Sequence, residues 1–208
     1  MIPMPDMKVT SYPGARQLIE PGMVAFFSHD TSTWWKKITA FPSWCVKHGQ
    51  TPAHECTHVG ILDWVRDRCV LIEATSPCVR VVPFSGLLGE APAGQATDPY
   101  SPAEELQQDG KWHAPYDGTV YVGSFAGCHG LAAAAAWDNL LLPFDYLDLA
   151  AIRMGIPRRN TKRYICSELV ADALLEGGVD LDNEANEWAY TPADLILSPK
   201  LKMLWRLR

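Results

Sequence analysis

The sequence predicts an α+β fold in which an antiparallel sheet packs against helices. Two stretches carry this prediction. Thr57–Asp63 and Cys69–Thr75 are both strand-like and are separated by a short polar segment, which is typical of a β-hairpin. From Cys166 onward, apolar residues recur three, four, seven and eight positions further along. This spacing is one face of an amphipathic helix, and Gly177-Gly178 then predicts its end.

Length and composition are those of one globular domain. The chain has 208 residues, of which 48% are hydrophobic and 20% are charged. Its net charge of −6, without a dense basic block, argues against nucleic-acid binding. No apolar run reaches the roughly 20 residues of a transmembrane helix. The N-terminus lacks the pattern of a secretory signal, so we expect a cytoplasmic protein whose six cysteines are reduced thiols.

Further strands are predicted by apolar runs and by alternation. Residues 1–20, punctuated by prolines, indicate an irregular lead-in. Strands are expected at residues 23–27, 79–82 and 119–123. The tail from Lys200 to Arg208 alternates with strand period, which predicts a docked edge strand with its apolar residues on one face, namely Leu201, Met203, Trp205 and Leu207.

Further helices are predicted from residues that cap helix ends and from prolines and glycines that terminate helices. They are expected at residues 34–41, 131–142 and 144–154, each followed by proline or glycine. Near the C-terminus, Thr191 is a cap with Pro192 at the first helical position. Residues 85–118 are rich in Pro, Gly, Gln and Asp. We interpret them as an insertion or lid within a single domain of residues 1–208.

Cys166 is the candidate nucleophile. It lies in the first turn of the predicted helix, where the helix dipole and unpaired amide groups favour a thiolate. The alternative is a structural role, because free cysteine is among the most buried residue types. A nucleophilic cysteine needs a histidine as its base.

His58 and Glu73 are the candidate base and its orienting acid. If the hairpin is centred between Val65 and Arg66, these two residues lie opposite each other, with Cβ atoms about 5 Å apart. A register shift of two would leave them diagonal neighbours on the same face. A carboxylate inside an apolar strand is costly without a partner. The pair serves either a cysteine nucleophile or only the stability of the sheet.

A zinc site is a competing interpretation of the same region. His54, Cys56 and His58 alternate, so an unbroken strand would place all three on one face, with His48 and Cys45 nearby. Their spacing matches none of the usual zinc patterns. We therefore expect no metal and no cofactor at the catalytic site.

The order histidine, acid, cysteine resembles the permuted papain-fold cysteine amidases of the NlpC-type superfamily, in particular the YiiX-like group. The matching stretches are residues 21–27, 57–61, 72–74, 144–145, 164–170 and 191–195. The resemblance implies a circularly permuted papain-like domain with the nucleophile at a helix N-terminus. It also implies that Cys166 is the nucleophile, His58 the base and Glu73 its orienter. Tyr164 matches an aromatic residue that lines the site or helps to bind the oxyanion.

These residues predict a thiol hydrolase that cleaves an amide or ester bond through a thioacyl enzyme. The resemblance leaves the substrate open between a peptide, a peptidoglycan fragment and an acyl lipid. Two alternatives remain. One is an acyltransferase that passes the same thioester to an amine or alcohol. The other is a binding module without catalysis, in which His58 and Glu73 only stabilise the fold.

Overall fold

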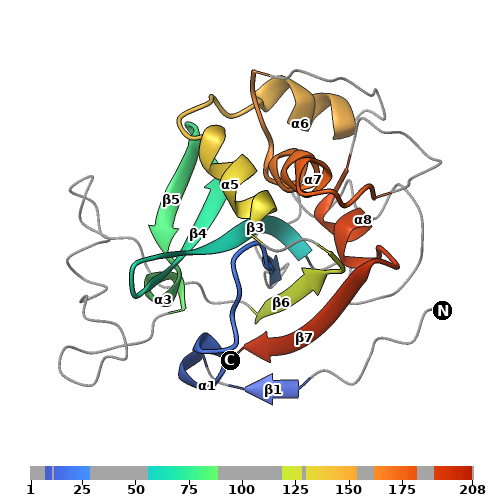
Figure 1. The fold of residues 1–208 in the computed structure, drawn as a ribbon. Helices are drawn as coiled ribbons and strands as arrows, with labels where there is room; N and C mark the ends of the chain where they lie inside the picture. Colours follow the sequence, from blue (N-terminus) through green and yellow to red (C-terminus); the bar gives the residue numbers. More distant parts are fainter. Residues whose placement is uncertain are drawn as a thin grey trace.

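The computed structural model describes residues 8–10, 12–28, 56–88, 119–127, 130–153, 162–181 and 190–207. Its strands are β1 (Lys8–Thr10), β2 (Val24–Ser28), β3 (Cys56–Val65), β4 (Arg68–Ala74), β5 (Val79–Pro83), β6 (Thr119–Phe125) and β7 (Leu201–Leu207). Its helices are α1 (Tyr12–Arg16), α3 (Phe84–Leu87), α5 (Leu131–Asp138), α6 (Tyr146–Arg153), α7 (Cys166–Glu176) and α8 (Pro192–Ile196). Figure 1 shows how these elements surround one sheet.

The described strands form a single seven-stranded sheet in the order β1-β7-β6-β2-β3-β4-β5. β1 pairs with β7 in parallel, and every other pair is antiparallel. The long β3 and β4 form the hairpin that the sequence predicted. This antiparallel sheet with packed helices confirms the α+β class.

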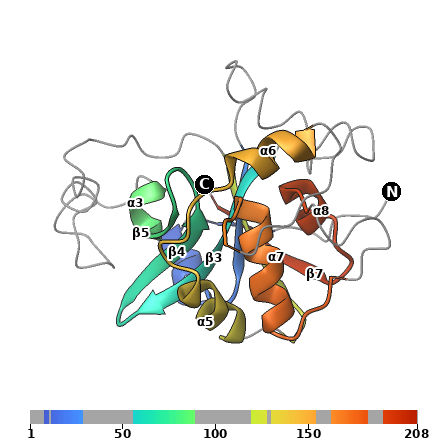
Figure 2. The same ribbon diagram turned by 90° about the horizontal axis from the view of Figure 1, so that it is seen from above.

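Apolar side chains fill both sides of the sheet. In β2, Val24 and Phe26 belong to a core cluster that includes residues of α5, α7 and α8. Ala25 and Phe27 belong to a second cluster that includes residues of α1 and α3. Figure 1 shows α5, α6, α7 and α8 above the sheet and α1 and α3 below it, and Figure 2 shows α5 and α7 side by side. Because both of its faces are covered, β2 is a continuous apolar run without alternation.

The register of the β3–β4 hairpin differs from the predicted one by two residues. Val65 pairs with Arg68 and Ile61 with Ile72, so the turn is centred between Arg66 and Asp67. Arg66 has a φ of 59°, the left-handed conformation that tight hairpin turns require of their first residue. The predicted centre was therefore one residue too early.

The C-terminal tail is a strand, as predicted, but two details were wrong. β7 lies between β1 and β6, so the edge of the sheet is β1 and not the tail. Its apolar residues also do not share one face. A bulge between Val122 and Gly123 shifts the register against β7, so Leu201 packs on the first cluster and Trp205 on the second.

The N-terminal segment and two helices also differ from expectation. Residues 1–20 were predicted to be irregular, yet they include β1 and α1, whose Tyr12 and Ala15 are buried. α5 ends at Asp138 and not at residue 142. The chain after it adopts a positive φ at Leu141 and pairs with the backbone of Val79. α6 begins two residues later than predicted, because the Asp145 carboxylate caps it.

The predicted helix at 34–41 and most of the predicted insertion lie outside the described residues. The first residues of that segment belong to the fold, since Phe84–Leu87 form α3 and Leu88 packs on the second cluster. The predicted boundary at residue 85 therefore falls within a helix. Residues 89–118 are not described.

Candidate active site

His58 and Glu73 lie side by side, as the sequence predicted. The Nε2 atom of His58 is 2.6 Å from Oε2 of Glu73. The observed register makes them diagonal neighbours, and a histidine can span that separation. The His58 side chain is 23% exposed and that of Glu73 only 5%, so the carboxylate lies behind the imidazole, away from solvent.

Arg80 is a third member of this cluster, and sequence reasoning missed it. Its Nε donates to Oε1 of Glu73 at 2.9 Å, and its Nη2 lies 2.8 Å from the same oxygen. The strand register places Arg80 directly opposite Glu73 across β4 and β5. The charge pattern of the sequence could have indicated this contact. The predicted strand at residues 79–82 carries one charged residue, Arg80, and it follows the apolar strand that contains Glu73.

The charges in this cluster shift the pKa of both titrating partners. Burial lowers the pKa of His58, but the negative charges of Cys166 and Glu73, and hydrogen bonds to both, outweigh it and raise the pKa to about 10. Burial raises the pKa of Glu73, but the positive charges of His58 and Arg80, and their hydrogen bonds, outweigh it and lower the pKa below its usual value. The His58 ring therefore holds its proton more strongly, and the Glu73 carboxyl holds its proton more weakly, than in free solution.

Cys166 is the first residue of the 11-residue helix α7, as predicted. The residue before it, Ile165, is extended, and its backbone N–H donates to Oε2 of Glu168 at 3.2 Å. Ser167 is fully buried and donates its hydroxyl to the carbonyl of Tyr190. These two contacts fix the start of the helix. Cys166 itself is half-buried and lies at the positive end of the helix dipole.

The structure brings Cys166 and Glu73 to the same imidazole from different elements. The side-chain hydrogen bond between His58 and Cys166 is among the causes of the raised His58 pKa. Since Nε2 of His58 faces Glu73, Nδ1 is the ring nitrogen that remains for the sulfur. A thiol, an imidazole and a carboxylate in this order can activate a sulfur nucleophile.

Tyr164 lies next to this group in sequence, but it is buried. Its side chain is 6% exposed and belongs to the first core cluster. Its backbone pairs with the segment before α6, accepting from Asp145 N–H at 3.1 Å and donating to Pro143 at 3.1 Å. A role for Tyr164 in binding substrate or the oxyanion stays a prediction.

The strand alternation on which the zinc interpretation was based is interrupted at Thr57. A bulge in the β2–β3 pairing leaves Thr57 unmatched, since Ser28 pairs with Cys56 and Phe27 with His58. Cys56 is consequently buried in the first cluster, whereas the His58 ring lies 5.6 Å from the ring of Phe27 in the second. The alternation that placed Cys56 and His58 on one face is broken.

The other proposed zinc ligands, Cys45, His48 and His54, lie outside the described residues. Within the described ranges, no group of three or more His, Cys, Asp or Glu side chains is arranged to hold a metal ion. In the same part of the chain, no helix is both long and apolar enough to cross a membrane.

Around Glu168, in the first turn of α7, lies a group of carboxyl groups that sequence reasoning did not identify. Asp145 and Asp148 are each 1% exposed, and Glu168 is half-buried beside them. Burial raises the pKa of Glu168, the Ile165 N–H opposes this, and the nearby acids Asp148, Asp145 and Asp172 add to it, giving about 8. Glu168 therefore binds a proton near neutral pH while capping the helix that carries Cys166.

Comparison with known proteins shows a structural likeness. No family model matches the chain, and no curated protein sequence matches it. The fold is similar to the crystal structure described as metalloprotein YiiX from Escherichia coli O157:H7. The likeness has a TM-score of 0.53 at 14% sequence identity and covers 89% of this chain and 98% of the other. It supports the YiiX-like fold that the sequence motifs predicted, and at this identity it concerns the fold alone.

Proposed function

We propose that this protein is a cysteine hydrolase that cleaves an amide or ester bond, built on a permuted papain-like fold of the NlpC type. The observation that carries the proposal is the placement of His58 between Glu73, at 2.6 Å, and the cysteine that begins α7. A structural ion pair alone would not require a half-buried thiol on the other side of the imidazole. The YiiX-like fold is consistent with it.

The proposed reaction has two steps. The Cys166 sulfur attacks the substrate carbonyl carbon, its proton having passed to Nδ1 of His58, and forms a tetrahedral intermediate. The intermediate collapses to a thioester when the carbonyl to leaving-group bond breaks and His58 protonates the departing amine or alcohol. A water molecule, deprotonated by His58, then attacks the thioester and releases the acid and the free thiol.

Each remaining group has one task. Glu73 holds the imidazole ring in place and stabilises its positive charge. The backbone N–H of Cys166, at the helix start where amides have no intrahelical acceptor, stabilises the oxyanion. On the family resemblance, we assign Tyr164 to the lining of the same site or to binding of the oxyanion. Candidate substrates are a peptide, a peptidoglycan stem peptide and an acyl lipid.

The test is intact-protein mass spectrometry of the enzyme incubated with representatives of the three substrate classes, with 4-nitrophenyl acetate as a generic ester. We expect an acyl adduct on Cys166, hydrolysed products in solution, and neither with Cys166→Ala. Product transferred to an added amine in place of water would indicate an acyltransferase. Each assay is repeated with a chelator, because the YiiX structure is described as a metalloprotein. No adduct and no product with any class would contradict the proposal.

A further inference from the structure

We infer that Arg80 is a positioning residue for the proposed catalytic group, which keeps the Glu73 carboxylate ionised and turned toward His58. The inference rests on the proposed function for its catalytic consequence. The electrostatic contact itself involves only Arg80, Glu73 and His58, and it can be tested without any substrate.

The two oxygens of Glu73 are divided between two partners. Oε2 accepts from His58, and Oε1 accepts from Nε of Arg80 with Nη2 at 2.8 Å. Two guanidinium nitrogens on one oxygen restrict rotation of the carboxylate about its own axis. With Oε1 held, Oε2 can point only toward the imidazole. The strand register supports this geometry, because Arg80 and Glu73 are directly opposed across β4 and β5.

Burial makes this second partner necessary. The Glu73 side chain is 5% exposed, and a buried carboxylate with an unsatisfied oxygen is strongly disfavoured. Both the charge and the hydrogen bonds of Arg80 lower the pKa of Glu73. Arg80 is itself 43% exposed, so its own cation stays partly hydrated. The arrangement therefore stabilises the buried anion without burying a second charge.

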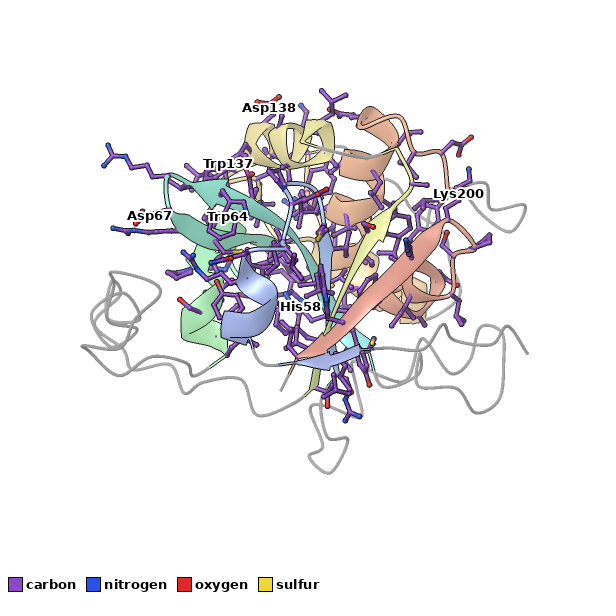
Figure 3. All side chains as sticks on the ribbon, turned by 60° about the horizontal axis from the view of Figure 1, so that its bottom comes forward. His58, Trp64, Asp67, Trp137, Asp138 and Lys200 are labelled. Carbon is purple, nitrogen blue, oxygen red and sulfur yellow. The ribbon has the colours of Figure 1, made fainter. Side chains whose placement is uncertain are left out.

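Arg80 and the hairpin turn offer a matched set of variants. Arg80→Gln removes both the positive charge and the planar guanidinium fork, that is, the Nε and Nη2 atoms that approach Oε1 of Glu73. Arg80→Lys keeps the charge and loses the planar fork. Arg66→Gln removes the same charge from the exposed turn at the other end of the β3–β4 hairpin. Figure 3 shows the neighbouring Asp67 of that turn well separated from His58.

The deciding measurement is the titration of the Glu73 side-chain carboxyl by carbon-13 NMR in the full chain. The carboxyl signal is assigned by its absence from the spectrum of Glu73→Gln. We expect the midpoint to move to higher pH in Arg80→Gln, and to stay near the wild-type value in Arg80→Lys and Arg66→Gln. Equal midpoints in Arg80→Gln and wild type would overturn the inference. This outcome is independent of catalysis, so it is distinguishable from a failure of the proposed hydrolase activity.

The catalytic consequence is measured with 4-nitrophenyl acetate. We expect kcat to fall roughly tenfold in Arg80→Gln with KM nearly unchanged, well below the 10²- to 10⁴-fold that a positioned acid or base contributes. The acid limb of the pH profile should move to higher pH. In a Glu73→Gln background, adding Arg80→Gln should not lower kcat any further, because the two residues act through one contact.

The conservative variant keeps the inference testable if Arg80→Gln does not fold. Arg80→Lys should show an ionised Glu73 but a kcat between those of wild type and Glu73→Gln. A wild-type kcat in Arg80→Lys would show that the guanidinium fork does not position the carboxylate. An equal loss from Arg80→Gln with and without Glu73 would show that Arg80 acts elsewhere.

Discussion

Oε2 of Glu73 lies 2.6 Å from Nε2 of His58, and this contact decides which nitrogen of the imidazole is left for chemistry. Because Nε2 faces the carboxylate, Nδ1 is the nitrogen to which the proposed mechanism assigns the proton exchange with Cys166. The orientation comes from the sheet, since His58 follows a bulge in β3 and Glu73 lies within the neighbouring β4. The thiol comes from a helix more than ninety residues further along the chain.

Cys166 is expected to be the most reactive thiol of the chain. Iodoacetamide near neutral pH should label it roughly tenfold or more faster than an ordinary cysteine, which is only a few per cent thiolate at pH 7. Peptide mass spectrometry compares it with the other five cysteines, Cys45, Cys56, Cys69, Cys78 and Cys128. Among these, Cys78 is half-buried and Cys56 and Cys69 are buried. His58→Ala should abolish the advantage. Labelling of Cys166 at the rate of Cys78 would count against the nucleophile.

His58→Ala and Glu73→Gln should both impair turnover while leaving the fold intact. We expect His58→Ala to lower kcat by roughly 10²- to 10⁴-fold, because it removes the general acid and base. Glu73→Gln should cost no more than this, since Glu73 orients the ring and does not accept the proton. Circular dichroism and thermal unfolding control for folding. If both variants lose fold and activity together, the pair is structural.

The raised His58 pKa predicts how stability depends on pH. The ordinary value is 6.5 and the folded value about 10, so the folded state holds its proton longer. The resulting stabilisation is complete below about pH 6.5, declines as pH rises and is gone above about pH 10. Cys166→Ala removes one cause of the shift, so the His58 titration followed by proton NMR should move to lower pH. Cys78→Ala, which is not among those causes, is the control.

Glu168→Gln should stabilise the protein more at alkaline than at acidic pH. The Glu168 pKa rises from 4.5 to about 8 on folding, so the folded state binds the extra proton and stability falls as pH rises between these values. The amide of Gln can still accept from Ile165 N–H but cannot ionise. Thermal unfolding at pH 5 and pH 9 measures the difference, with Glu176→Gln at the exposed end of α7 controlling for net charge. An equal change at both pH values would contradict the buried carboxyl cluster.

Residues 89–118 are expected to act as a lid or specificity element. They lie in sequence between α3 and β6, and β5, which leads into α3, is four inter-strand steps from β6 in the sheet, a distance of about 19 Å. A Gly-Ser linker of about 12 residues has a typical end-to-end distance of this size, so it can replace residues 89–115 and retain the packed Leu88. We expect the variant to fold and to keep Cys166 alkylation, but to lose turnover of its own substrate. Normal turnover would show that the segment is dispensable.

The sequence by itself determined most of the local structure. The period of the apolar residues after Cys166 predicted α7 to its last turn, and Thr191 with Pro192 predicted the start of α8, where the Thr191 hydroxyl accepts from Asp194 N–H. It also placed His58 and Glu73 on one face despite a wrong turn centre. A shift of two residues preserves the face, because side chains alternate with a period of two.

Only the tertiary structure decided how these pieces meet. The bulge at Thr57 reverses the face of Cys56, and no propensity scale marks it, because it arises from the pairing of β3 with β2. The charge pattern of the two strands is compatible with an Arg80–Glu73 contact, but only the pairing of β4 with β5 places the two residues directly opposite each other. The approach of Cys166 to His58 depends on where α7 packs against the sheet. Periodicity reports which side of an element is buried, whereas the partner buried against it is set by long-range contacts.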